Sequence, residues 1–142
     1  MRVIRNLLLT TFVLSIISLC GQSVAAQNIV AGNEYGDRLE IIDFEPELPA
    51  TLTMGNKLFI KIAYQLKSTT NCRIWARPYT DGKRTPNYFA HPSPLYKNGS
   101  GQLYAFFGFK QPGHVDQVQI KMSCEGSSIL VLIANIDANW IH

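Results

Sequence analysis

The chain has 142 residues, of which 13 are Lys or Arg and 10 are Asp or Glu, and its formal net charge is +3 at pH 7. This small excess excludes the class of proteins that bind nucleic acid or an anionic membrane through their overall charge. The length suits one domain with its own hydrophobic core.

The first 26 residues have the pattern of a secretory signal peptide. Arg2 and Arg5 give a positive start, residues 7–19 form an apolar run, and residues 23–26 are small. Such a run is too short to remain as a membrane-spanning helix. We therefore expect cleavage before Gln27, export to the periplasm or the extracellular space, and no transmembrane anchor after processing. Without the leader, 11 basic and 10 acidic residues remain, so the mature charge is close to neutral.

Cys72 and Cys124 are the two cysteines of the expected mature chain. In an oxidising compartment two thiols in a small domain are expected to pair. Neither lies in a CxxC motif, which argues against a redox or metal-binding pair. We predict a structural disulfide, which in the loop-entropy model contributes roughly 4 kcal/mol.

Alternation of apolar residues with period two dominates the region after the leader and predicts β-strands. The predicted strands are residues 38–44, 57–66, 72–79, 88–90, 102–109, 115–124 and 129–140. Residues 27–37 are expected to form a flexible segment before a domain that spans 38–142. The run 129–136 is apolar at both parities, which predicts a central strand or one covered on both faces.

About seven strands of this spacing predict an all-β fold, an antiparallel β-sandwich. Their count and spacing resemble an immunoglobulin-like domain at the level of fold. In such a sandwich the third and sixth strands are neighbours, so Cys72 at the start of one is expected beside Cys124 at the end of the other. Immunoglobulin domains instead join their second and sixth strands across the two sheets. The resemblance therefore implies the architecture and no specific family.

Charge is unevenly distributed along the chain. Residues 34–47 hold six acidic residues against Arg38, and residues 57–97 hold eight basic residues against Asp81. One interpretation is that strands from the two stretches lie side by side and neutralise each other. The other is a basic face around Arg73, Arg77, Lys83 and Arg84 that meets an acidic partner.

The connection formed by residues 80–101 is the strongest candidate for recognition. It is long, and long connections between strands are often functional. Three prolines restrict it, and arginine and aromatic side chains of this kind are preferred at interface centres. The alternative is that its aromatic residues cover a sheet edge. The binding residues predicted in this segment are Arg84, Tyr88, Phe89, His91 and Tyr96.

The strand at 72–79 offers a second set of candidates, because Arg73, Trp75 and Arg77 share one face of it. If this face points outward, it could stack on a sugar or on a partner's aromatic residue and pair with carboxylates. The alternative is a half-exposed sheet face whose indole lies on neighbouring strands.

Residues for catalysis or metal binding show no recognisable spacing. His91, His114 and His142 lie far apart, and neither an HExxH nor a GxSxG motif is present. We therefore expect a non-enzymatic protein without a metal or cofactor. The leading hypothesis is an exported module that binds a protein partner, in an inhibitor, immunity or envelope-assembly role. The alternatives are a carbohydrate or peptidoglycan-binding module that uses Trp75, Tyr88 and Tyr96, and, least favoured, a small secreted enzyme.

Overall fold

The computed structural model describes residues 29–68 and 71–142, so the predicted signal peptide lies outside the described residues. The described part of the chain forms ten strands and contains no helix long and apolar enough to cross a membrane. The strands are β1 (Ile29–Gly32), β2 (Arg38–Glu45), β3 (Ala50–Thr53), β4 (Lys57–Leu66), β5 (Cys72–Thr80), β6 (Lys83–Arg84), β7 (Tyr88–Ala90), β8 (Gly99–Phe109), β9 (Gly113–Cys124) and β10 (Ser127–Ile141).

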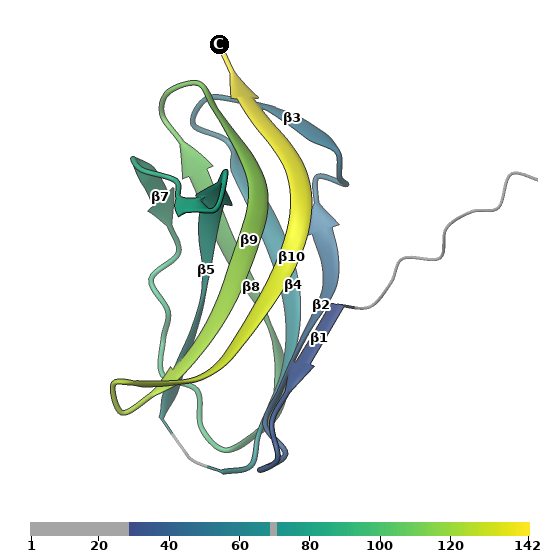
Figure 1. The fold of residues 1–142 in the computed structure, drawn as a ribbon, viewed down its shortest axis with the longest axis vertical. Helices are drawn as coiled ribbons and strands as arrows, with labels where there is room; N and C mark the ends of the chain where they lie inside the picture. The colour runs from purple at the N-terminus through teal and green to yellow at the C-terminus, as the bar shows by residue number, and fades with distance from the viewer. Residues whose placement is uncertain (1–28, 69–70) are drawn as a thin grey trace, which may run out of the picture.

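The strands form two sheets that pack face to face (Figure 1). Sheet A has the order β1-β2-β4-β8-β7, and sheet B has the order β3-β10-β9-β5-β6. The seven predicted strands correspond to β2-β4-β8-β7 in one sheet and β10-β9-β5 in the other, which is the order of an immunoglobulin constant-type sandwich. The predicted all-β sandwich is confirmed.

Three short strands were not predicted from the sequence. Within the segment 27–37, which was expected to be flexible, Ile29–Gly32 instead pairs with β2 as an antiparallel edge strand. Pro46 and Pro49 interrupt the chain between β2 and β3, and β3 then pairs in parallel with the end of β10 in sheet B. The two-residue β6 forms a hairpin with the end of β5.

Asp37 fixes the turn between β1 and β2 to the end of β4. Its buried carboxylate accepts hydrogen bonds from the amides of Lys67 (2.8 Å) and Ser68 (3.0 Å), from the Ser68 hydroxyl, and from Asn33 Nδ2 (3.0 Å). Burial alone would raise the pKa of Asp37, but these hydrogen bonds together lower it from 3.8 to about 2. The turn is thus held by an ionised side chain.

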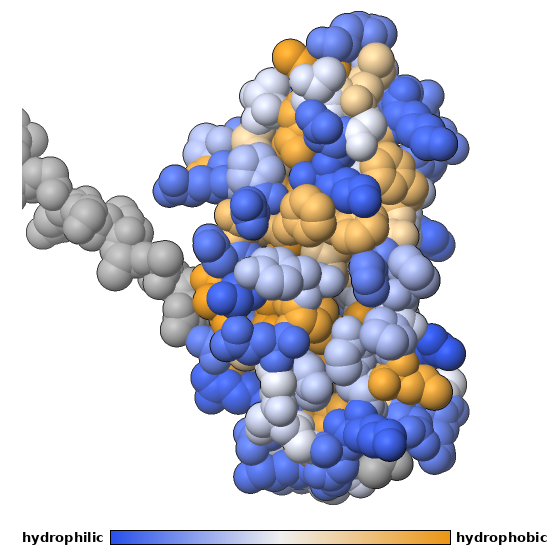
Figure 2. All heavy atoms as spheres, turned by 180° about the vertical axis from the view of Figure 1, so that it is seen from behind, coloured by the Kyte–Doolittle hydropathy of each residue, from blue (hydrophilic) through white to orange (hydrophobic). Residues whose placement is uncertain are grey.

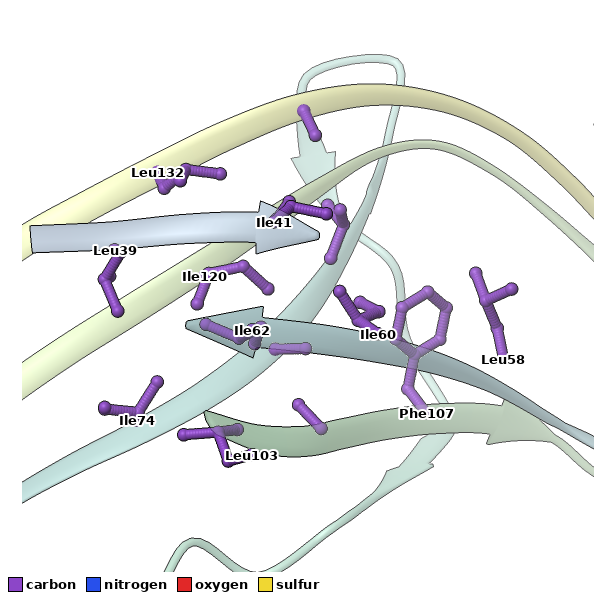
Figure 3. Packing of buried hydrophobic residues seen from close by; sticks show 14 of the residues in the cluster. Leu39, Ile41, Leu58, Ile60, Ile62, Ile74, Leu103, Phe107, Ile120 and Leu132 are labelled. Carbon is purple, nitrogen blue, oxygen red and sulfur yellow. The ribbon is translucent and has the colours of Figure 1, made fainter. Parts of the chain in front are cut away.

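The core lies between the two sheets and is built from the inward residues of each alternating strand. Figure 3 shows Leu39, Ile41 and Ile62 of sheet A together with Ile120 and Leu132 of sheet B. Near one end, the indole of Trp140 packs against Phe107 and Phe109, with ring centroids 5.7 and 4.8 Å away. Its Nε1 donates to the carbonyl of Asn56 at 2.9 Å, so the buried polar atom is satisfied.

Of the two alternatives predicted for residues 129–136, coverage on both faces is wrong, whereas β10 does lie inside sheet B, between β3 and β9. Leu130, Leu132 and Ala134 are buried, but Val131 is 41% exposed and Ile133 is 52% exposed. Both lie on the outward face of sheet B, where no second layer covers β10. Apolar β-branched residues suit a strand even where their side chains meet water. Apolar residues at both odd and even positions of a strand therefore do not show that both of its faces are covered.

The disulfide between Cys72 and Cys124 is present as predicted. The two residues face each other directly on β5 and β9, with Cα atoms 4.1 Å apart, and both are buried. The covalent link therefore joins neighbouring strands within sheet B, instead of crossing between the sheets.

Candidate functional site

Strand β5 presents the predicted row of side chains on its outward face. Ile74 and Ala76 are buried in the core, whereas Arg73 is exposed and Trp75 and Arg77 are half-buried. The alternation arises because successive residues of a strand point to opposite faces of the sheet.

The segment from Thr80 to Gly101 runs along the free edge of β5. The amide of Thr85 donates to the carbonyl of Pro78 at 3.0 Å, and the amide of Ile74 donates to Ser93 Oγ at 2.8 Å. Cys72 and Tyr96 exchange two backbone hydrogen bonds of 3.0 and 2.7 Å. Between these points β7 pairs with β8, so the segment crosses from sheet B to sheet A (Figure 1). It covers the sheet edge, as the alternative interpretation of this segment expects.

A shallow groove of about 430 Å³ lies between β5 and this segment. Five of the eight predicted binding residues line it. The lining residues are Arg73, Trp75, Ala76, Arg77, Tyr88, Ala90, His91, Pro92 and Ser93. We refer to this feature as the groove.

Arg84 reaches the groove through Tyr88. Its Nη2 donates to the Tyr88 hydroxyl at 2.9 Å, and its guanidinium lies 5.3 Å from the centre of the Tyr88 ring. These contacts fix the orientation of an aromatic residue that lines the groove. The Arg84 side chain therefore supports this wall and adds a positive charge beside it.

The positive charge of the groove is not balanced locally. None of its lining residues is acidic, and among the described residues the ion pairs are Arg38–Glu40 and His114–Asp137. The acidic stretch, residues 34–47, includes β2. This strand pairs with β4 in sheet A and places Asp43 opposite Lys61. The neutralisation considered from the sequence therefore applies at most to the lysines of β4. It does not reach the arginines of β5, which belong to sheet B.

Arg77 carries the clearest sign of a missing partner. Its Nε is buried and has no hydrogen-bond partner among the described residues. A buried N–H group without an acceptor is unfavourable, and groups of this kind in native proteins call for an explanation.

Two predicted residues do not belong to the groove. The ring of Phe89 lies over Gly108, on the outer face of sheet A. Tyr96 packs on Tyr64, with ring centroids 5.0 Å apart. Its burial, and secondarily the nearby Tyr64, raise the pKa of Tyr96. The structure therefore gives both side chains a packing contact elsewhere.

Two other hollows lie on the surface of the described chain. One of them has a volume of about 390 Å³ and is lined by Leu95 and Glu125. It shares Arg73 and Trp75 with the groove, so the indole borders two concavities. A larger hollow of about 710 Å³ lies where the β1–β2 turn meets Ser68 and Ser128. It contains none of the predicted residues.

Titratable side chains form no recognisable catalytic or metal centre within residues 29–68 and 71–142. No three His, Cys, Asp or Glu residues in this part of the chain gather to hold a metal ion. His114 Nε2 lies 3.2 Å from Asp137 Oδ1, but the two side chains are 46% and 62% exposed and neither lines the groove. Both side chains of this pair are therefore open to solvent.

A further surface, on the outer face of sheet A, was not predicted from the sequence. Phe59, Tyr104 and Phe106 point outward from β4 and β8, beside Phe89 and His91. The alternation in residues 102–109 predicts a strand, but aromatic residues occur at both its odd and its even positions. The sequence alone therefore does not indicate which set faces water.

No protein-family model matches this chain, and a search of curated proteins gives no significant match.

Proposed function

We propose that this chain is an exported, non-enzymatic β-sandwich that binds an acidic segment of a protein partner in the groove. The observation that carries the proposal is Arg77, which lines a groove without an acidic lining residue and whose buried Nε has no hydrogen-bond partner in the described part of the chain. A carboxylate is the natural ligand for such an arginine, because the guanidinium fork matches its two oxygens.

The rest of the groove suits a peptide rather than an isolated anion. Trp75 and Tyr88 offer rigid contact area, and Ser93 and Arg73 border the floor of the groove. Aromatic and arginine side chains are the residue types that dominate binding energy at protein interfaces. An acidic residue followed by an apolar or aromatic one fits this combination of charge and surface.

The expected route to the partner is export, and the disulfide supports it. A buried disulfide is typical of oxidising compartments and rare in the reducing cytosol. An inhibitor, immunity or envelope-assembly role is consistent with a small binding module of this kind, although the fold alone does not imply a function.

Carbohydrate binding is the second candidate, because Trp75 separates two concavities on the sheet B surface. Of the three aromatic residues assigned to it from the sequence, Tyr96 is engaged with Tyr64. Binding through the indole would be abolished by Trp75→Ala and little changed by Arg77→Gln, whereas peptide binding depends on both.

The test is affinity purification of the tagged protein from its native host, with identification of co-purified proteins by mass spectrometry. A partner retained by the wild type and lost from Arg77→Gln supports the proposal. Arg38→Gln is the matched control, since it removes one positive charge from an outward position on β2, far from the groove. Equal retention by both variants would reject the groove as the binding site.

A further inference from the structure

We propose that the outer face of sheet A is an interface through which two copies of this chain form a two-fold symmetric dimer. The surface in question is called the aromatic face. It comprises Phe59, Phe89, His91, Tyr104 and Phe106, together with Lys57 and Lys61. This inference does not require a ligand in the groove, although His91 belongs to both surfaces.

The aromatic face is unusual for the solvent side of a sandwich. Antiparallel sheets with one buried face normally present polar residues on the other, and β9 of sheet B does so with Gln117, Gln119 and Lys121. On sheet A, the corresponding positions of β4 and β8 hold Phe59, Tyr104 and Phe106. Figure 2 shows pale orange side chains gathered on this side of the molecule, with blue ones between them. Phe59, Phe89 and Phe106 are half-buried and Tyr104 is 51% exposed, so an aromatic surface remains accessible here, as it does at interaction sites.

The side chains of the face are already organised. The rings of Phe59 and Phe106 meet edge to face at 5.5 Å, and His91 contacts Phe106 at 5.2 Å. Lys57 Nζ lies 4.2 Å from the centre of the Phe106 ring, and Lys61 Nζ lies 5.9 Å from that of Tyr104. An ordered surface loses little conformational entropy when it is covered.

One row of residues across the sheet indicates which partner fits. Glu45 on β2 is opposite Phe59, Phe59 is opposite Phe106, and the amide of His91 donates to the Phe106 carbonyl. The row therefore reads acid, Phe, Phe, imidazole. Consider a two-fold axis in the interface that runs parallel to the strands, between β4 and β8. It places the row of one copy against the same row of the other copy in reverse order. Glu45 then meets the partner copy's His91, and Phe59 meets the partner copy's Phe106. The neighbouring row contains Lys61 and Tyr104, which the same axis brings together between copies.

This self-complementarity favours a second copy over an unrelated protein. Two-fold interfaces use the same patch on both subunits, so a patch must carry both members of each interacting pair. Here Glu45 and His91 lie at opposite ends of the row, and Lys61 and Tyr104 lie in the centre of the aromatic face. Homodimer interfaces are also the more apolar class of protein interface.

The test compares the self-association of the full mature chain with that of variants at Tyr104, which is 51% exposed and therefore tolerates substitution. Sedimentation equilibrium over a concentration series gives the dimer dissociation constant. We expect the wild type to dimerise. Tyr104→Lys, which faces the partner copy's Lys61, should weaken the dimer about tenfold or more, whereas Tyr104→Glu should retain it. Because Lys61 also lies opposite Tyr104 within each chain, circular dichroism confirms that both variants are folded at the concentrations used.

Val131→Lys is the matched control, because it places the same charge on the outward face of sheet B, at a residue 41% exposed. This control should dimerise as the wild type does. A wild type that has the mass of one chain at every concentration would overturn the proposal. So would equal weakening by Tyr104→Lys and Val131→Lys. Loss of binding to another protein or to a polysaccharide in Tyr104→Lys, with a monomeric wild type, would assign the face to that occupant and reject the dimer.

Discussion

Cys72 and Cys124 occupy opposite positions on two adjacent antiparallel strands, and their Cα atoms lie 4.1 Å apart. The bridge joins residues 52 positions apart in the chain, so it removes a large loop from the freedom of the unfolded state. The oxidising compartment expected from the sequence would keep this bridge formed, and the bridge in turn stabilises the fold.

Removal of the disulfide should destabilise the domain strongly. The loop-entropy model gives a loss of roughly 4 kcal/mol for Cys72→Ala with Cys124→Ala, which is a large share of the stability of a small domain. Urea unfolding of the oxidised, reduced and double-variant proteins measures the loss. Reduced and double-variant proteins should agree with each other. A midpoint unchanged by reductant would contradict the role given to the bridge.

Asp37 should make stability depend on pH in the acidic range. Its folded pKa of about 2 lies below the ordinary value of 3.8, so the unfolded chain binds more protons between these values. The contribution of roughly 2 kcal/mol is therefore complete above about pH 5, and it is lost as the pH falls through the folded pKa.

Asp37→Asn should remove this contribution at neutral pH. It should also make the free energy of unfolding less dependent on pH in the acidic range. Asp43→Asn is the control, because Asp43 is exposed and bonds only within its own strand, to the amide of Phe44. Urea titrations between pH 2 and 7 compare the two variants with the wild type. A pH dependence in the acidic range that is as steep in Asp37→Asn as in the wild type would show that other groups control it.

The two tryptophans should respond in opposite ways to truncation. Trp140 is buried against Phe107 and Phe109, so Trp140→Ala should cost about 3–5 kcal/mol of stability. Trp75 lies half-buried on the outward face, so Trp75→Ala should change stability by less than about 1 kcal/mol and affect ligand binding instead. Chemical denaturation measures the first effect and partner retention the second. Similar losses of stability in the two variants would mean that Trp75 belongs to the core.

Gly108 is required beneath the aromatic face. A Cβ atom at this position would lie 2.5 Å from the carbonyl oxygen of Asn56 and 2.6 Å from the ring of Phe89. Gly108→Ala should therefore cost about 1–3 kcal/mol and displace Phe89. Gly113→Ala is the control, since the nearest atom to a Cβ at this position, in the ring of Phe109, would be 3.9 Å away. Equal melting temperatures for the two variants would contradict this packing.

Much of the fold was predictable because the longer strands alternate cleanly. Strand β4 has the predicted bounds, 57–66, and the disulfide followed from the positions of the two cysteines within the expected topology. The short strands β1, β3 and β6 were missed because two to four residues carry too little periodicity. For β3 the pairing also depends on a distant strand, since Ala50 lies opposite Ala138.

The candidate site was predicted only in part, for a related reason. Trp75 and Arg77 lie on a long strand, where parity assigns each side chain to a face. Phe89 and Tyr96 belong to a short strand and a loop, where it does not. Phe106 and Phe107 illustrate the same limit, because adjacent aromatic residues of β8 face water and core respectively, and only the packed sheets distinguish them.

We propose that Arg77 binds a carboxylate of a protein partner in the groove. The most direct measurement is the affinity of the identified partner for the wild type, Arg77→Gln and Arg38→Gln by isothermal titration calorimetry at low and high salt. We predict that Arg77→Gln weakens binding about tenfold or more and reduces its salt dependence, while Arg38→Gln binds as the wild type does. Equal affinities for all three proteins would contradict the account.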